Sequence, residues 1–438
     1  MRIAVIGCGL RTPLLIYGFA RSGMTIEEIA LYDVKRERAE LMARLGREAA
    51  PESRIRLVPV TSVEKAVSGA SFVINSVRVG EMKRRASDER IALEHGFAGQ
   101  ETTGPAGFAM AMRTIPVVLE QARAVERHAK DAWIINFTNP AGLITQAIAA
   151  HTGARVVGIC DTPAELFFRI ALALREPLDD VDCDYFGLNH LGWVRAVRVR
   201  GEDVTARLLA SDEMLRSLYP VELFAPELIR GLGLIPTEYL FFYYNRVRAL
   251  RNQQAVGATR GEELEEHNRQ LFTQLKDHGR ALDAYRAYLN RRNSNYLKLE
   301  GAGQSSHDSP DVDWNPFEGE TGYHRIAVDS IRALSGDQPV RIVLNVPNRG
   351  TIADLADEDV VEVPCLVDRS GVRPVPVGRL PESVGGVVQS VKAYERLTIE
   401  AAVGKRMDRA VMALFTNPIV GDWMAARELV EAMLVRRG

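Results

Sequence analysis

The sequence lacks an excess of charge of either sign. Its 55 Lys and Arg residues are balanced by 57 Asp and Glu residues, which leaves a formal net charge of −2. Binding the phosphates of a nucleic acid requires a clustered surplus of basic side chains, and this balance does not indicate one. We therefore expect no nucleic-acid partner.

Long apolar runs are also missing. No stretch approaches the roughly 18 consecutive apolar residues of a transmembrane helix, and the N-terminus leads straight into a strand pattern without the apolar core of a signal peptide. Cysteine is scarce, because Cys8, Cys160, Cys183 and Cys365 are too few and too scattered for a disulfide framework. We predict a cytoplasmic protein with reduced thiols and no membrane partner.

What the sequence does contain is an alternation of short β-branched runs with helical periodicity. This alternation predicts a parallel sheet wrapped by helices, an α/β fold of the Rossmann-like, doubly wound class. The strand-like runs cover residues 3–6, 29–32, 55–60, 72–77, 133–137 and 156–159, with helical segments such as 13–21, 36–47 and 115–128 between them.

The pattern changes near residue 185, where alternating residues predict antiparallel strands. We therefore divide the chain into a dinucleotide-binding domain, 1–190, and an α+β substrate domain, 191–438, which share one site. In the second domain we expect helices over most of 210–292, a polar surface loop or lid at 301–322, a helix at 325–334, strands at 341–346 and 360–366, and helices at 380–403 and 408–434.

A glycine-rich turn follows the first strand. Gly7 and Gly9 match the first two glycines of a G-x-G-x-x-G fingerprint, and Thr12 takes the place of the third. Such glycines let the backbone approach a pyrophosphate at a helix N-terminus. Asp33, at the end of the second strand, can accept hydrogen bonds from ribose hydroxyls, which favours NAD over NADP. A tight turn with a surface aspartate and no cofactor is the alternative interpretation.

The sixth strand ends in Cys160 and Asp161, at the edge where open α/β sheets bind ligands. His190 lies on the first element that leaves this edge. A thiolate and an imidazole can hold a divalent cation and leave positions open for substrate oxygens and water, which suits a Lewis acid. An inert buried thiol and a hydrogen-bonded core histidine are the alternative, since no paired metal-ligand spacing supports the site.

Candidate substrate-binding residues lie on three further segments. The amide of Asn139 can bond sugar or ribose hydroxyls, although Asn before Pro is also an ordinary turn before a helix. Arg78, Arg85 and Arg90 can hold an anionic group, or they form a solvated charged helix face. Tyr239 lies in an aromatic cluster that by itself indicates core packing.

Taken together, these segments resemble the family 4 glycoside hydrolases, which depend on NAD and a divalent metal. The resemblance covers nearly the whole chain, and residues 100–105 are most similar to the 6-phospho-β-glucosidase branch. It rests on residues 77–80, 88–91, 99–108, 136–142, 158–161, 187–190, 235–240 and 361–365.

The resemblance implies hydrolysis of a small, 6-phosphorylated glucoside through oxidation of the sugar at C3 by bound NAD+. Residues matching Cys160 and His190 hold the cation, usually manganese, that polarises the ketone. A tyrosine matching Tyr239 then removes the C2 proton, the C1 leaving group is eliminated, water adds, and the hydride returns to C3. Asp161 matches the acid that protonates the leaving group in α-specific members. Family members are usually homodimers or homotetramers, and we expect the same here.

Three positions depart from the family pattern. Asp161 stands where β-specific members often have Asn, Glu81 replaces a usual glycine, and residues 291–296 replace an Arg-Gly-Gly pattern. These positions leave the anomer and the 6-phosphate requirement open. Two other functions remain as alternatives: a 2-hydroxy-acid dehydrogenase of the lactate and malate type, with His190 as general base, and a dinucleotide sensor without catalysis.

Overall fold

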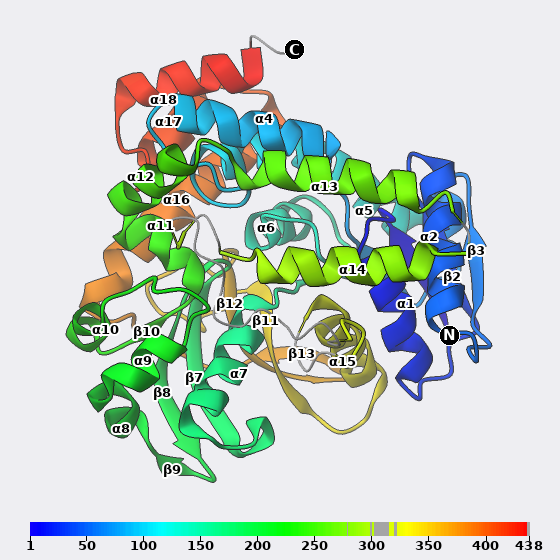
Figure 1. Ribbon diagram of the computed structural model, residues 1–438, viewed down its shortest axis with the longest axis horizontal. Helices are drawn as coiled ribbons and strands as arrows, with labels where there is room; N and C mark the ends of the chain where they lie inside the picture. Colours follow the sequence, from blue (N-terminus) through cyan, green and yellow to red (C-terminus); the bar gives the residue numbers. More distant parts are fainter. Residues whose placement is uncertain (278, 298–299, 302–314, 319–321, 436–438) are drawn as a thin grey trace.

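The computed structural model describes residues 1–277, 279–297, 300–301, 315–318 and 322–435. In these residues the chain forms a nine-stranded sheet and a smaller sheet, which lies to one side of it at the lower left of Figure 1, with helices packed around them. Most of the polar stretch predicted as a loop or lid at 301–322 lies outside the described residues. No helix in the described ranges is both long enough and apolar enough to cross a bilayer.

Six parallel strands form two thirds of the larger, nine-stranded sheet. They are β1 (Arg2–Ile6), β2 (Glu28–Tyr32), β3 (Arg56–Pro59), β4 (Phe72–Asn75), β5 (Trp133–Asn136) and β6 (Arg155–Gly158). Their spatial order, β3-β2-β1-β4-β5-β6, is that of a doubly wound dinucleotide-binding fold. The predicted fold class is therefore confirmed.

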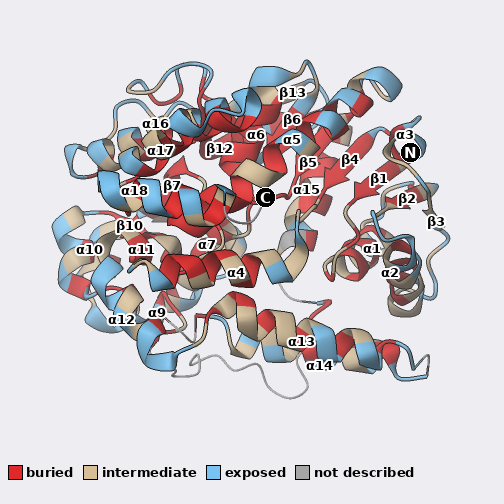
Figure 2. Ribbon diagram, turned by 90° about the horizontal axis from the view of Figure 1, so that it is seen from above, coloured by how far each residue is buried: buried red, intermediate tan, exposed pale blue. Residues whose placement is uncertain are grey.

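Helices cover both faces of these strands, which explains why the strands read as nearly continuous apolar runs. Central positions such as Ile3, Val73 and Ile135 have almost no exposed surface, and the strands β1, β4 and β5 are coloured as buried in Figure 2. The helices that connect or follow these six strands are α1 (Thr12–Arg21), α2 (Arg36–Ala49), α3 (Val63–Val67), α4 (Glu81–Glu94), α5 (Gly104–His128), α6 (Ala141–His151) and α7 (Thr162–Leu174).

The strands predicted at 341–346 and 360–366 extend this same sheet. They form β11 (Val340–Pro347) and β12 (Val360–Asp368), followed by β13 (Gly371–Pro374), and β11 joins β6 in antiparallel register at Asn345 and Gly158. A Cβ on Gly158 would lie 2.9 Å from the Cβ of Asn345 and 2.3 Å from Thr145 Oγ1. Glycine at the end of β6 therefore lets β11 approach.

A hairpin of β7 (Val181–Leu188) and β8 (Leu191–Val199) begins the second, smaller sheet, which β9 (Glu202–Asp203) and β10 (Ile235–Pro236) complete. The predicted division after residue 190 falls in the turn of this hairpin, and the nine-stranded sheet contains strands from both sides of it. His190 occupies the turn with a left-handed backbone, at a φ of +61°.

Helices make up most of the remaining chain. The predicted helix at 408–434 is two helices, because the chain turns at 417–421, where Asn417 Oδ1 accepts a hydrogen bond from the Ile419 amide and Gly421 has a φ of +60°. These helices are α8 (Thr205–Ala210), α9 (Asp212–Ser217), α10 (Pro226–Leu232), α11 (Phe241–Tyr244), α12 (Arg246–Val256), α13 (Arg260–Gln274), α14 (Ala281–Ser294), α15 (Tyr323–Ser335), α16 (Glu382–Gly404), α17 (Met407–Thr416) and α18 (Trp423–Val430).

Candidate functional site

The glycine-rich turn lies between β1 and α1, where it was predicted. Gly7 has a φ of +89°, and a Cβ there would lie 2.4 Å from the Ser76 carbonyl oxygen, so only glycine fits. A Cβ on Gly9 would instead meet no atom within 4 Å. Thr12, the first residue of α1, is buried. The turn therefore presents open space in front of a helix N-terminus, which is the shape that a pyrophosphate requires.

Asp33 follows β2 and faces the same turn. Its Oδ2 accepts a hydrogen bond from the Cys8 amide at 2.9 Å, and its Oδ1 accepts one from the Lys35 amide, also at 2.9 Å. Each carboxylate oxygen keeps a lone pair for a further donor. The structure thus brings the four residues that we predict for cofactor binding to one end of the parallel sheet, and their donor and acceptor groups fit a dinucleotide.

Cys160, His190 and Tyr239 form a contiguous cluster, although they come from three different elements. Cys160 follows β6, His190 lies in the β7–β8 turn, and Tyr239 belongs to the short 3₁₀ helix η2 (Glu238–Leu240). The Sγ of Cys160 is 3.4 Å from His190 Nε2. The rings of His190 and Tyr239 stack with centroids 3.8 Å apart and an angle of 18° between their planes.

The two proposed metal ligands are buried and neutral without a cation. Burial lowers the pKa of His190 to about 3, and burial, reinforced by the negative charges of Glu362 and Asp161, raises the pKa of the Cys160 thiol well above its usual range. A divalent cation reverses this preference, because it stabilises a thiolate and binds a neutral imidazole.

The ring nitrogens of His190 also suit a divalent cation. Its Nδ1 is buried and has no hydrogen-bond partner in the described part of the chain. Within the described residues no cluster of three or more His, Cys, Asp or Glu side chains suits a metal ion. Cys160 and His190 would therefore act as two protein ligands of an open site.

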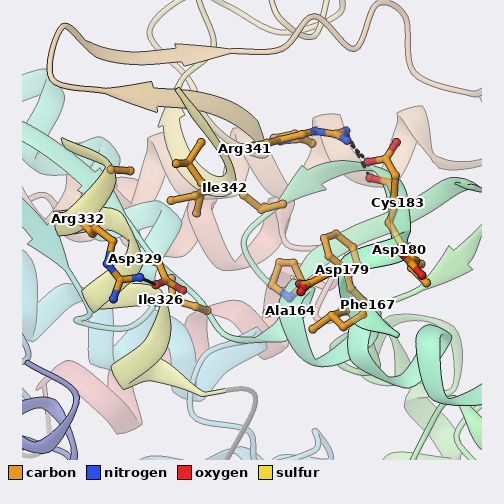
Figure 3. Close-up of a pocket in the computed structure, with 18 of the residues that line it drawn as sticks. Ala164, Phe167, Asp179, Asp180, Cys183, Ile326, Asp329, Arg332, Arg341 and Ile342 are labelled. Carbon is orange, nitrogen blue, oxygen red and sulfur yellow. Dashed lines mark hydrogen bonds and ion pairs between the residues drawn. The ribbon is translucent and has the colours of Figure 1, made fainter. Parts of the chain in front are cut away.

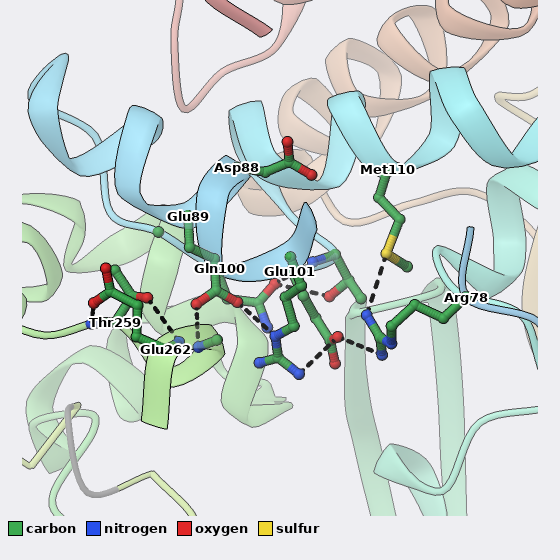
Figure 4. Close-up of polar contacts among 12 residues, drawn as sticks. Arg78, Asp88, Glu89, Gln100, Glu101, Met110, Thr259 and Glu262 are labelled. Carbon is green, nitrogen blue, oxygen red and sulfur yellow. Dashed lines mark hydrogen bonds and ion pairs between the residues drawn. The ribbon is translucent and has the colours of Figure 1, made fainter. Parts of the chain in front are cut away.

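Arg78 and Arg85, predicted as substrate-binding residues, both contact Glu101. Arg78 Nη2 lies 2.6 Å and Arg85 Nη1 2.8 Å from Glu101 Oε2, and Figure 4 shows Arg78 facing Glu101. Arg85 Nε also donates to Glu89 Oε1 at 2.7 Å. Arg85 is close enough to Tyr239 for an electrostatic interaction, which joins this cluster to Cys160 and His190. Arg90, by contrast, pairs with Glu262.

Glu101 is a site residue that sequence reasoning missed. Burial raises its pKa, but the guanidinium groups of Arg78 and Arg85, helped by Arg11 and Arg292, more than offset burial and hold the pKa well below its usual range. The available signal was its position between glycines in the segment 99–108.

Two further buried carboxylates, Glu238 and Glu362, were also missed. Glu238 Oε1 accepts hydrogen bonds from Tyr296 Oη at 3.0 Å and Thr162 Oγ1 at 3.3 Å. Burial, reinforced by Asp161, raises the pKa of Glu238 to about 7 despite these donors. Its signal was adjacency to Tyr239, in the segment that carries the family resemblance.

The second carboxylate, Glu362 of β12, holds the turn that carries His190. Its Oε2 accepts a hydrogen bond from Tyr185 Oη at 2.7 Å, and its Oε1 accepts from Asn189 Nδ2 at 3.0 Å and Asn345 Nδ2 at 2.8 Å. Asn189 Oδ1 in turn accepts from the Gly142 amide at 3.3 Å. The predicted substrate residue Asn139 is buried in the loop just before Gly142, so this loop and the His190 turn are linked.

A cavity of about 980 Å³ lies beside Cys160, between α7 and β7 on one side and α15 and β11 on the other. Figure 3 shows Phe167, Ile326 and Ile342 on its walls, together with the ion pairs of Arg332 and Arg341. Cys160 alone among the predicted site residues lines this cavity. Of the Cys160–His190–Tyr239 cluster, only Cys160 therefore borders this cavity.

Comparison with known proteins covers both halves of the chain. The family model "Family 4 glycosyl hydrolase" matches residues 2–176, and "Family 4 glycosyl hydrolase C-terminal domain" matches residues 185–420. A 6-phospho-β-glucosidase of Thermotoga maritima is 30% identical over 99% of this chain and 98% of its own length. A probable 6-phospho-β-glucosidase of Bacillus subtilis is 30% identical over 99% of this chain and 96% of its own length.

Solved structures extend the similarity to three dimensions. The Thermotoga maritima 6-phospho-β-glucosidase with manganese, NAD+ and glucose-6-phosphate has a TM-score of 0.81 and 29% identity, over 100% of this chain and 98% of that one. The same enzyme with NAD and glucose-6-phosphate has a TM-score of 0.85 and 30% identity, over 99% and 97% of the two chains. A lactate dehydrogenase from a deep-sea metagenome library, at 14% identity and a TM-score of 0.54 over 92% and 98%, is similar in fold alone.

Proposed function

The chain belongs to the family 4 glycosyl hydrolases, and we propose that it hydrolyses 6-phosphorylated β-glucosides with NAD+ and Mn²⁺. The similarity to 6-phospho-β-glucosidases over nearly the whole chain supports the substrate. The NAD+, manganese and glucose-6-phosphate in the solved Thermotoga maritima structure support the cofactors. The observation that carries the proposal is the Cys160–His190–Tyr239 cluster, because it places a metal-binding pair directly against a phenol.

Residues of this chain would hold both NAD+ and Mn²⁺. Gly7, Gly9, Thr12 and Asp33 would bind the dinucleotide, and Cys160 and His190 would bind the cation. When bound, NAD+ supplies a reversible hydride acceptor and Mn²⁺ a Lewis acid, which together make the C2 proton of the sugar acidic.

Tyr239 then acts as the base. Its Oη takes the proton from C2, while stacking on His190 fixes the plane of its ring. The guanidinium of Arg85 lies close enough to stabilise the negative charge of the phenolate. Asp161, the residue next to Cys160, would protonate the leaving-group oxygen. The resemblance gives this role to α-specific members, so the α-glucoside arm of the assay below tests it.

Arg78 and Arg85 differ in exposure, and we therefore assign them different roles. The side chain of Arg78 remains 29% exposed while it pairs with Glu101, so it can also reach an anionic group of the substrate. The side chain of Arg85 is 7% exposed and is held by Glu89 and Glu101. We assign substrate contact to Arg78 and Asn139, and positioning of Glu101 and Tyr239 to Arg85.

An assay of paired nitrophenyl α- and β-glucosides, with and without a 6-phosphate, tests this function. The protein is first treated with EDTA and then supplied with NAD+ and Mn²⁺ separately and together. We expect nitrophenol release from the phosphorylated β-glucoside only when both are present, with no net NADH. Accumulation of NADH without hydrolysis would instead support a dehydrogenase, and cofactor binding without any turnover would support a sensor.

Hydrolysis in D₂O tests the role of Tyr239 more directly. Removal and return of a proton at C2 introduces deuterium at that carbon, whereas direct displacement at C1 leaves C2 unlabelled. We expect a labelled product.

We further propose that the enzyme is a cytoplasmic homo-oligomer. Light scattering after size-exclusion chromatography measures its oligomeric state.

A further inference from the structure

A group of charged side chains lies beside Asp33, at the proposed NAD site. Lys35 and Arg38, at the beginning of α2, both contact Glu81, the first residue of α4. Lys35 Nζ lies 2.8 Å and Arg38 Nη2 2.7 Å from Glu81 Oε1. We call these three side chains the Glu81 bridge, because they join the starts of two helices that are about 45 residues apart in the sequence.

The backbone at Glu81 is unfavourable for any residue but glycine. Its φ is +57°, directly after Gly80 at +84°, and a left-handed conformation costs a residue with a Cβ on the order of 1 kcal/mol. Burial raises the pKa of Glu81, but hydrogen bonds from Lys35 and Arg38 more than offset burial and keep the carboxylate ionised at neutral pH. A charged side chain is therefore held between two cations at a position where glycine fits better.

The position of the Glu81 bridge near Asp33 suggests a role for the Glu81 carboxylate in binding the cofactor. In dinucleotide-binding folds, a carboxylate after the second strand binds the ribose 2′-hydroxyl of NAD, whereas a nearby arginine accommodates the 2′-phosphate of NADP. This chain has both kinds of residue, with Asp33 followed by Lys35 and Arg38. The formal charges of Asp33, Glu81, Lys35 and Arg38 cancel, and without Glu81 they would leave one positive charge in front of the ribose.

On the basis of the proposed NAD site, we propose that Glu81 is a specificity-determining residue for the cofactor. By pairing with Lys35 and Arg38, it keeps both cations away from a 2′-phosphate, so that the site selects NAD+ over NADP+. Asp33 alone would discriminate less, because Lys35 and Arg38 lie within five residues of it and can swing toward the phosphate.

Isothermal titration of the metal-free protein with NAD+ and with NADP+ tests the proposal. Glu81→Gln keeps the length of the side chain and removes its charge, and we expect it to tighten NADP+ binding about tenfold relative to NAD+. Adding Arg38→Gln to this variant should reverse most of the gain. Glu81→Gly suits the left-handed backbone and should give the same shift, which separates the effect from any loss of folding.

Glu40→Gln is the matched control. It removes one carboxylate from α2, the helix that carries Arg38, and frees Arg36, 2.8 Å away, without touching Lys35 or Arg38. We expect it to leave the ratio of NADP+ to NAD+ affinity unchanged, and an equal shift in this control would overturn the proposal. An unchanged ratio in both Glu81 variants, with NAD+ still bound, would contradict this inference alone. Failure of the unaltered protein to bind NAD+ would contradict the proposed function as well.

Discussion

The imidazole of His190 stacks on the phenol ring of Tyr239, with the ring centroids 3.8 Å apart. At the edge of the same ring, Nε2 of His190 lies 3.4 Å from the Cys160 sulfur. His190 thus connects the proposed cation site to the proposed base. A change in the position of this imidazole would move both, so the tests below separate the hydroxyl of Tyr239 from its ring.

Tyr239→Phe keeps the stacked ring and removes only the hydroxyl. Because a positioned general base typically contributes a factor of about 10² to 10⁴, we expect kcat for the phosphorylated nitrophenyl glucoside to fall by that amount. Binding of Mn²⁺ and NAD+, measured by titration, should stay within about twofold. Tyr243→Phe removes a neighbouring hydroxyl and should leave kcat nearly intact. Retention of most of the activity in Tyr239→Phe would rule out this base.

Cys160→Ser and His190→Ala each remove one proposed metal ligand. We expect Mn²⁺ affinity to fall by at least about 100-fold in each variant, because an open site with two protein ligands cannot lose one without losing most of its binding. NAD+ affinity should not change, since the glycine-rich turn lies on a different strand. Cys183→Ser, another buried thiol, serves as the control. Unaltered Mn²⁺ binding in either variant would contradict the assignment.

The Glu101 carboxylate gives a pH-dependent contribution to stability. Arg78 and Arg85 offset its burial and hold its pKa below that of the unfolded chain, so the stabilisation is present above about pH 4 and is lost as the pH falls. Glu101→Gln should lower the free energy of unfolding by about 2 to 4 kcal/mol near neutral pH and by less at about pH 3.

Urea denaturation at several pH values measures this difference. Glu27→Gln, at a carboxylate whose side chain is 75% exposed, should change the free energy of unfolding little at any pH. A penalty for Glu101→Gln that is as large at acidic as at neutral pH would show that the charge of Glu101 does not matter.

The stability that Glu238 contributes depends on pH in the opposite direction to that of Glu101. Burial raises its pKa to about 7, so the folded chain binds this proton more tightly than the unfolded chain does. Its contribution to stability is complete below about pH 4 and is lost as the pH rises toward 7. Glu238→Gln, which cannot ionise, should therefore become more stable than the unaltered protein by on the order of 1 to 3 kcal/mol at about pH 8, and less so at about pH 5.

Thermal denaturation at these two pH values checks the prediction. Glu227→Gln changes an exposed glutamate of α10 and should shift the melting temperature equally little at both. A melting temperature for Glu238→Gln that differs from the unaltered protein by the same amount at both pH values would contradict the raised pKa.

Much of the fold could be predicted from the sequence because the signals are local. The six parallel strands follow β-branched runs, and the turn at Gly7 and Gly9 needs backbone conformations and close approaches that its own residues reveal. The break at 417–421 was missed, since apolar spacing continues across it and only the Asn417 side chain and Gly421 mark the turn. The attachment of β11 to β6 also depends on residues far apart in the sequence.

Some features of the candidate site could likewise be predicted from the sequence, and others depend on the tertiary structure. Residue types and motif positions identified the cofactor turn, Asp33, Cys160 and His190, whereas Tyr239 was singled out by the resemblance to the family. Only the tertiary structure decided that the side chains of Cys160, His190 and Tyr239 touch, that Arg78 and Arg85 share Glu101, and that Glu81 pairs with Lys35 and Arg38. The physical reason is that backbone conformation depends on neighbours in the sequence, whereas burial and charge pairing depend on neighbours in space, which the packing of distant segments creates.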